Sequence, residues 1–517
     1  MRIWKILWVV CALCVTSCSR SVRDDVLAHY EALGDTAALA SAEFLLDNMD
    51  NKYTMSSSAM SDFYAFTDSL FKKNLPDGEL RRQYKNFCQN RLELYTWKES
   101  DQSTLKAEFL IRHIDTMMTL YRRPWNSHLS SIEFHEYVLP YRIHHEEIEL
   151  WMASYRNSFR NVISGLQADT LSLIDAAVRI NQRLKRNGVR IVDAPRFCDG
   201  YKASYLLSMK VGQCLDYCTL GAFAMRSVGI PCAIDGYPDG HYWNVLILPG
   251  KSIEDFSACE LNPGEQHVRR WLEYRHWKNV PRVYRTCFSE QAGSLALICE
   301  ETPIPAYFRD PCLKDVTAWY YSGFTVRIPS PRMEPDRFGY LAVHDCAFQF
   351  VVWAVRMNGE YLFENLSDSI VYFPTRYREE HCVFPLDYPF VLLQVDGKTV
   401  RHRFVPDVAH PQRMTLYRKY HVKRNHNLFL KRALGAVVQG ADTPDFSDAR
   451  ILCRVESVPE MRWTNLPVHT SDVCRYVRWL SPDSSYCSVA ELQFYDREGR
   501  IVFGNVIGTD GYYDGEP

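Results

Sequence analysis

The stretch "VGQCLDYCTLGAFAMRSVGIPC" (residues 211–232) places a cysteine at the start of a segment rich in small residues, bounded by glycine and proline. Gly212 breaks the preceding segment, so we expect a helix to begin at Cys214 or just before it. Gly229 ends this helix and Pro231 prevents its continuation, because glycine favours the left-handed conformation that follows a helix. The pattern predicts a short helix with a thiol at its N-terminus.

Cys214 is the candidate nucleophile of this stretch. A thiol at a helix N-terminus lies beside the positive end of the helix dipole and beside unpaired N–H groups, which favour the thiolate and lower its pKa. The same N–H groups could receive a developing oxyanion. Cys218 lies one turn further in, on the face that we expect to be buried. That face is formed by Leu215, Cys218, Ala222 and Met225.

The candidate base is His241, which opens the segment "HYWNVLIL" (241–248). Its alternating pattern predicts a strand with His241, Trp243 and Val245 on one face. Histidine is the side chain that most often takes the proton of a thiol nucleophile. Cys214 and His241 are therefore predicted to form a nucleophile–base pair.

The order of these features resembles the transglutaminase-like branch of the papain-like fold, over about residues 160–270. The resemblance implies a Cys-His-acid triad that attacks a carboxamide or peptide carbonyl and forms a thioester, which water or an amine then resolves. It implies no cofactor and no metal. The matching residues are Gly212, Cys214, Gly229, Ile230, Pro231, Gly240, His241 and Trp243.

The resemblance also implies an acidic residue on the next strand, where it would orient His241. A simple hairpin would place Asp255 opposite Asn244, on the wrong face of the sheet. A turn one residue longer, or a bulge, would place Asp255 opposite Val245, on the face of His241. Asp255 is our preferred candidate for the third member of the triad.

Two other positions compete with Asp255. The family more often carries its acid directly after an aromatic residue, and Ser257 holds that position here, after Phe256. Glu260 is the alternative carboxylate. The choice depends on the register of the two strands, which the sequence leaves open.

Other interpretations of the motif remain open. Free cysteines are often buried without a chemical role, and His241 could be a core histidine. A metal site built from Cys214, Cys218, Cys232 and His241 lacks the second close ligand pair typical of zinc. A further alternative is a lipid-anchored protein that binds glycan or protein and has an inactive thiol site.

The N-terminus is typical of an exported protein. Arg2 and Lys5 precede an apolar run at 6–15, which is too short to span a bilayer but suits a signal peptide. The run ends in Val-Thr-Ser-Cys, which resembles a bacterial lipobox and predicts cleavage before Cys18 and lipidation there; a plain secretory signal is the alternative. The residue after Cys18 is Ser19 and not aspartate, which by the sorting rule for lipoproteins favours the outer membrane of the cell envelope.

Composition and charge limit the classes of molecule that the protein could bind. Removal of residues 1–17 leaves 58 basic and 62 acidic side chains, a net charge of −4 with neutral histidines. Such a balance argues against nucleic acid as a partner. We expect a protein, peptide or glycoconjugate substrate and attachment to the membrane through the lipid. The 17 cysteines show no spacing that specifies a disulfide framework.

A chain of 517 residues is long enough for several domains. After Pro281 the pattern changes from helical to strands rich in aromatic and β-branched residues, with hairpin turns predicted at Asn358-Gly359 and Asp396-Gly397. The last segment resembles the opening strands of a discoidin-type, galactose-binding-like jelly roll, through Arg475-Tyr476-Val477-Arg478 and "VAELQFYD" (489–496).

We therefore predict an α+β multidomain protein. The expected parts are a signal peptide (1–17), a helical N-terminal region (18–155), a transglutaminase-like core (156–290), an antiparallel β-sandwich (300–410), a linker (411–460) and a partial jelly-roll-like C-terminus (461–517).

Overall fold

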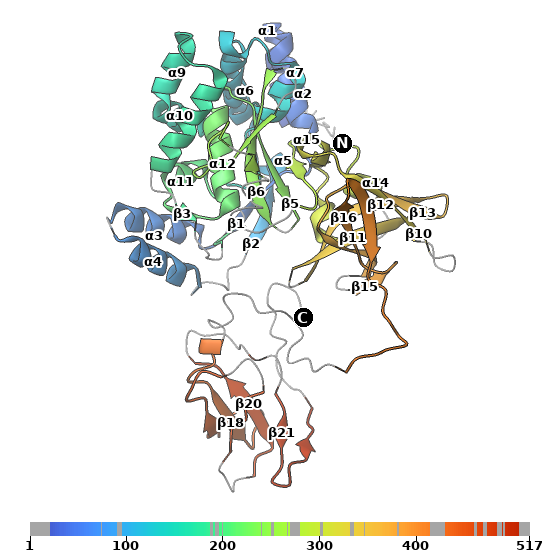
Figure 1. The fold of residues 1–517 in the computed structure, drawn as a ribbon. Coiled ribbons are helices and arrows are strands. Elements are labelled where there is room, and N and C mark those ends of the chain that lie inside the picture. Colours follow the sequence, from blue (N-terminus) through green and yellow to red (C-terminus); the bar gives the residue numbers. More distant parts are fainter. Residues whose placement is uncertain are drawn as a thin grey trace, which may run out of the picture. The chain divides into compact units, whose positions relative to one another are not determined.

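The chain forms two compact units, Met1–Pro406 and Asp407–Pro517, in the computed structural model (Figure 1). Cys18 and the lipobox lie outside the described residues. Among the helices described, none is long and apolar enough to cross a membrane. The structure describes residues 21–73, 75–89, 96–186, 190–191, 196–198, 200–238, 240–249, 253–265, 267–268, 280–299, 303–330, 336–345, 347–379, 382–413, 430–459, 463–468, 473–482, 489 and 492–505.

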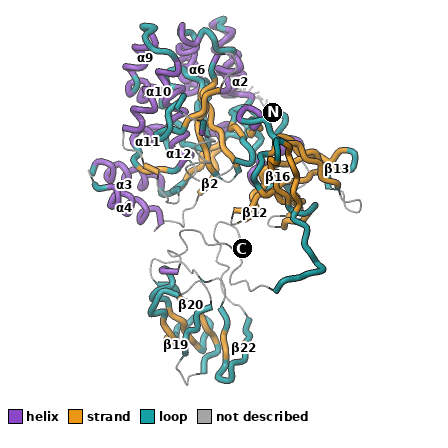
Figure 2. Tube along the Cα trace, in the orientation of Figure 1, coloured by secondary structure: helices purple, strands orange, loops and turns teal. Residues whose placement is uncertain are grey.

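The N-terminal region is mainly helical, as predicted (Figure 2). It also contains an antiparallel strand pair, β1 (Tyr53–Ser57) and β2 (Thr96–Ser100), which the sequence pattern did not indicate. The helices are α1 (Val22–Leu33), α2 (Thr36–Asp47), α3 (Met60–Lys72), α4 (Asp77–Gln89), α5 (Asp101–Thr104), α6 (Ala107–Tyr121), η1 (Pro124–Asn126), α7 (Ser131–Tyr137) and α8 (Met152–Ser158).

The central part of the first unit is a five-stranded antiparallel sheet in the order β7-β6-β5-β8-β9. Helix α12 lies along this sheet, beside α10 and α11 (Figure 1). The strands are β5 (Cys232–Tyr237), β6 (His241–Ile247), β7 (Ile253–Phe256), β8 (Tyr284–Thr286) and β9 (Leu313–Asp315). The remaining elements are α9 (Arg160–Gln167), α10 (Leu173–Arg186), β3 (Arg190–Ile191), α11 (Ala203–Ser208), β4 (Val211–Gly212), α12 (Cys214–Arg226), α14 (Leu295–Ile298), η3 (Ala306–Arg309) and α15 (Thr317–Tyr320).

The helical region and the central sheet share one hydrophobic core. This core runs without a break from Val26 to Phe288 and includes α12 and the inner face of β6. The boundary expected near residue 155 therefore does not separate two independent cores.

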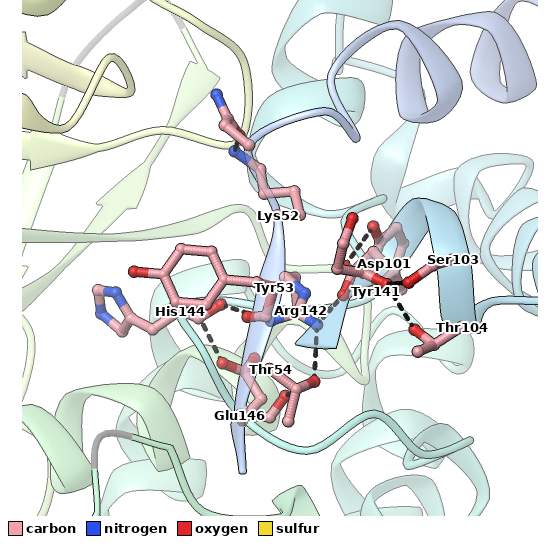
Figure 3. A network of polar contacts seen from close by, with 12 residues as sticks. Lys52, Tyr53, Thr54, Asp101, Ser103, Thr104, Tyr141, Arg142, His144 and Glu146 are labelled. Atoms are coloured by element: carbon pink, nitrogen blue, oxygen red, sulfur yellow. Dashed lines mark hydrogen bonds and ion pairs between the residues drawn. The ribbon is translucent and has the colours of Figure 1, made fainter. Parts of the chain in front are cut away.

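A buried polar network ties the β1–β2 pair to the segment after α7 (Figure 3). Arg142, which is 1% exposed, pairs with the fully buried Asp101. The guanidinium also donates to the Tyr53 carbonyl at 2.6 Å and to the Thr54 hydroxyl at 3.2 Å. Tyr141 donates to the second oxygen of Asp101 at 2.8 Å. The network pairs the two buried charges with each other and fixes the β1–β2 pair on the core.

The β-rich region forms one continuous eight-stranded antiparallel sheet in the order β10-β13-β12-β11-β14-β16-β17, with β15 paired to β14. Its edges approach each other, since Arg401 on β17 donates to the Arg327 carbonyl on β10 at 3.2 Å. The result is a nearly closed, barrel-like sheet, where two packed sheets were expected. The strands are β10 (Phe324–Pro329), β11 (Phe338–Asp345), β12 (Ala347–Met357), β13 (Glu360–Leu366), β14 (Val371–Glu379), β15 (Cys382–Pro385), β16 (Phe390–Val395) and β17 (Lys398–Arg403).

The second unit contains a three-stranded sheet in the order β19-β18-β20. Strands β18 (Val437–Ala441) and β19 (Arg450–Arg454) lie within the expected linker, yet they pair with each other, and β18 pairs with β20 (Tyr476–Leu480). The expected linker at 411–460 is therefore corrected, because its second half supplies strands to the sheet that contains β20. A separate pair is formed by β21 (Phe494–Tyr495) and β22 (Ile501–Val502).

Candidate active site

Helix α12 begins at Cys214, as the glycine and glutamine before it predict. Its N-terminus is closed by a capping box, in which the Asp216 carboxylate accepts a hydrogen bond from the backbone amide of Gln213 at 2.8 Å. Arg196 pairs with the buried Asp216, with 3.0 Å between Nη2 and Oδ1. These contacts fix the first turn of the helix and the backbone that carries the thiol.

Helix α12 packs unusually close to β6 because it presents a glycine to the sheet. A Cβ atom at Gly221 would lie 2.7 Å from the Cβ of Ala258 and 2.8 Å from Oδ1 of Asn244. The Asn244 side chain donates to the Cys218 carbonyl at 2.8 Å. The helix is thereby held in register with the strand that begins at His241.

The Cys214 thiol lies against the backbone on either side of His241. Its Sγ atom donates to the Gly240 carbonyl at 3.6 Å, and the amides of Tyr242 and Leu215 face the sulfur and lower its pKa. Burial outweighs these amides and raises the pKa of Cys214 above its usual 9.0. The prediction that the helix N-terminus lowers the pKa of Cys214 is therefore wrong. Removal from water disfavours the thiolate more than the helix N-terminus stabilises it. Burial also raises the pKa of Cys218, which is 1% exposed.

His241 is the first residue of β6, as predicted, and pairs with Tyr237 on β5. Its ring centroid lies 6.2 Å from that of Tyr237 and 6.3 Å from that of Trp243. The strand alternation places His241 and Trp243 on one face of the sheet, whereas Asn244 on the other face contacts α12. The thiol therefore meets β6 at its first residues, where it contacts the backbone of the two chain neighbours of His241.

A buried hydrogen-bonded chain lies behind His241. The Trp243 indole donates to the Tyr320 hydroxyl at 2.9 Å, and Tyr320 donates to Asp235 at 2.6 Å. Asp235 in turn accepts two bonds from Arg285, at 2.7 and 2.9 Å. Arg285 and Asp235 are both fully buried. This chain fixes the strand face that carries the imidazole.

Asp255 lies opposite Val245, so it is on the face of His241, as the longer turn between β6 and β7 requires. Its buried carboxylate accepts from His267 Nδ1 at 2.8 Å and from the Val268 amide at 2.8 Å. Val245 is four residues beyond His241, about 13 Å along an extended strand. The structure thus brings Asp255 to the correct face but binds it to His267.

The other acid candidates lie beyond the end of β7. Ser257 donates to the Glu260 carboxylate at 3.1 Å. Burial raises the pKa of Glu260, and the Glu260 charge raises the pKa of Tyr217 and Cys218 on α12. The loop that carries Glu260 lies against α12, since a Cβ atom at Gly221 would lie 2.7 Å from the Cβ of Ala258.

The comparison with known families agrees with this arrangement. Residues 159–274 match the family described as the transglutaminase-like superfamily. These residues form a transglutaminase-like domain. The superfamily generally catalyses cysteine-based acyl transfer or hydrolysis. No curated protein and no solved structure matches the chain.

The described part of the transglutaminase-like domain holds no group of three or more histidine, cysteine or acidic side chains able to bind a metal. Sequence reasoning missed two features of this domain. The Asp216 cap was detectable, since an acid three residues after Gln213 is the spacing of a capping box. The chain from Trp243 to Arg285 was not, because its members come from β5, β6, β8 and α15, far apart in the sequence.

Proposed function

We propose that the protein is a lipid-anchored cysteine hydrolase or acyltransferase of the transglutaminase-like type. The observation that carries the proposal is the position of the Cys214 thiol, 3.6 Å from the carbonyl of Gly240 and facing the amide of Tyr242. Both are neighbours of His241 in the chain. A base close to the nucleophile is the first requirement of thiol catalysis, and this backbone contact supports His241 for that role.

The proposed reaction starts from the protonated thiol, because burial raises the pKa of Cys214. His241 takes the thiol proton as Cys214 attacks a carboxamide or peptide carbonyl, and the amides of the first turn of α12 receive the oxyanion. The carbon–nitrogen bond then breaks, and His241 returns its proton to the departing ammonia or amine. Water or a second amine resolves the thioester and releases Cys214. We favour water, which is far more abundant than amines outside the cell.

For Asp255 we propose a positioning role. Its two hydrogen bonds hold His267 and the Val268 amide, and so support the segment that follows β7. Direct orientation of His241 by Asp255 would require the carboxylate to leave both partners and to cross most of the length of β6. Asp255→Asn should therefore weaken catalysis less than His241→Ala does.

The anchoring and location are proposed from the N-terminal sequence alone. Lipidation at Cys18 would attach the protein to the cell envelope, with the outer membrane favoured by Ser19. Cys18→Ala should leave the precursor uncleaved by the lipoprotein signal peptidase and without acyl chains. A variant that matured and fractionated with membranes as the parent does would refute the anchor.

A second candidate is a lipid-anchored glycan- or protein-binding protein with an inactive thiol site. The raised pKa of Cys214 and the serine at the family's usual acid position favour it. Release of ammonia from a protected glutaminyl-glycine separates the two candidates. The enzyme should release ammonia, Cys214→Ser should not, and Cys218→Ser should retain the activity. Ammonia release that persists in Cys214→Ser would exclude the proposed nucleophile.

A further inference from the structure

A cavity of about 230 Å³ lies in the first unit, between the strands β8 and β9 and the barrel-like sheet. It is separate from the thiol site, because neither Cys214 nor His241 lines it. Each water molecule occupies about 30 Å³ in the liquid, so the cavity has room for about seven water molecules. A single structural water would not fill it. Its walls are Arg282, Tyr284, Gly293, Ser294, Leu295, Phe308, Asp310, Leu313, Asp315, Val352 and Trp353.

Two buried polar groups in the wall have no hydrogen-bond partner among the described residues. One is the hydroxyl of Ser294, a residue that is 5% exposed. The other is Nε of Arg282, a residue that is 9% exposed. Buried polar groups are almost always hydrogen-bonded, so each of these needs an explanation. Both line the same cavity, and a ligand there would satisfy them together.

The rest of the Arg282 guanidinium is already committed. Nη1 donates to the backbone carbonyls of Glu364 and Asn365, the second at 3.2 Å, and Nη2 pairs with Asp315. The guanidinium has five N–H groups, and these bonds leave the one on Nε and one on Nη2. The unpartnered Nε–H can donate to a ligand oxygen, such as that of a hydroxyl group.

The wall carries two carboxylates and one guanidinium. Asp310 and Asp315 would repel an anion, and the Arg282 guanidinium weakens their attraction for a cation. A ligand must accept a bond from Arg282 and donate to carboxylates, which a neutral hydroxyl does in both directions. The three aromatic rings of Tyr284, Phe308 and Trp353 offer apolar surface between these polar groups.

From this combination we propose that the cavity binds one neutral saccharide unit. A sugar ring has hydroxyls that donate and accept, and C–H faces that contact aromatic rings. The cavity is also smaller than the usual site of a drug-sized molecule, which fits a single ring. The proposal does not depend on the activity of Cys214.

The test uses the full-length protein and saturation-transfer NMR with free glucose, galactose and N-acetylglucosamine, each at millimolar concentration. Free glutamine and ethanolamine serve as zwitterionic and cationic probes. We expect at least one saccharide to bind. Ser294→Ala, which removes one hydroxyl, should weaken that binding about fivefold, the effect of one hydrogen bond. Trp353→Ala should weaken it further.

Trp97→Ala is the matched control, because Trp97 is 40% exposed on β2 and does not line the cavity. It should leave saccharide binding unchanged, and the thermal midpoints of all variants show whether they fold. Three results would overturn the proposal. No saccharide binds; saccharide binding is the same in Ser294→Ala and Trp353→Ala as in the parent; or only glutamine or ethanolamine binds.

Discussion

At the scale of single residues, burial decides the protonation of the Cys214 thiol and of the His113 imidazole. It raises the pKa of Cys214 and so makes the thiol dependent on a base. It acts in the opposite direction on histidines, since it disfavours their charged form. His113 is 3% exposed and shares a hydrogen bond of 2.7 Å with the Leu139 carbonyl. Burial lowers the pKa of His113 from 6.5 to about 4.

This shift predicts a loss of stability in mild acid. The folded state keeps His113 neutral while the unfolded chain binds a proton below pH 6.5. The free energy of unfolding should therefore fall as the pH drops from about 6.5 to about 4, by about 1.4 kcal/mol per pH unit from this group and about 3 kcal/mol in total. His113→Gln keeps a donor for Leu139 and should make the dependence shallower by that amount. Denaturant unfolding across this range measures it; an equal slope in both proteins would contradict the burial argument.

At the scale of elements, the contact between α12 and the central sheet depends on the glycine at position 221. Gly221→Ala adds a Cβ atom within 2.8 Å of both Ala258 and Asn244. Helix and strand must then move apart, and we expect a destabilisation of about 1–3 kcal/mol from overpacking. Displacement of the helix should also slow the reactions of Cys214.

Gly78→Ala is the control for this substitution. Gly78 lies in α4, and a Cβ atom there meets nothing within 4 Å. Alanine should stabilise the protein by up to about 1 kcal/mol, since it is the better helix former. Thermal or chemical unfolding of both variants checks the pair. Equal stabilisation by both alanines would show the effect of helix propensity alone, and a Gly221→Ala variant at least as stable as the parent would show that the close approach is absent.

Local elements were predictable where short-range chemistry decides them. The turns at Asn358-Gly359 and Asp396-Gly397 were correct, because both residues of each turn adopt positive φ, as a two-residue hairpin requires. The start of α12 followed from its flanking residues. The register of Asp255 against Val245 was left as one of two choices, because one residue of turn length decides it.

At the scale of the whole molecule, long-range pairing was not predictable. The strands between residues 324 and 403 were expected as two sheets and form a single one, because closure depends on which edges meet and not on the pattern within each strand. The packing of the helical region against the transglutaminase-like domain was not predictable for a similar reason. Both regions are apolar on the faces that meet, and only the folded chain shows that they form one core.

This shared core predicts the result of truncation. A chain of residues 156–406 lacks the apolar partners of α12 contributed by the N-terminal helices, and should not unfold cooperatively. A chain of residues 21–406 contains every described residue of the first unit and should do so. Circular dichroism during thermal unfolding distinguishes them. A cooperative transition in the shorter chain would mean that the transglutaminase-like domain folds by itself.

The central claim is that His241 activates Cys214. Its most direct test is the rate at which iodoacetamide alkylates Cys214, followed by mass spectrometry from mildly acidic to alkaline pH. Because burial raises the thiol pKa, reactivity at neutral pH should depend on His241, and His241→Ala should slow Cys214 alkylation at least about tenfold and move its onset to higher pH.

His402→Ala is the matched control, because His402 is exposed on β17, outside the transglutaminase-like domain. It should leave the rate unchanged, and Cys218 should stay unreactive in every variant. An unchanged pH profile in His241→Ala would contradict the account, and Cys214 would then be a buried thiol without a base.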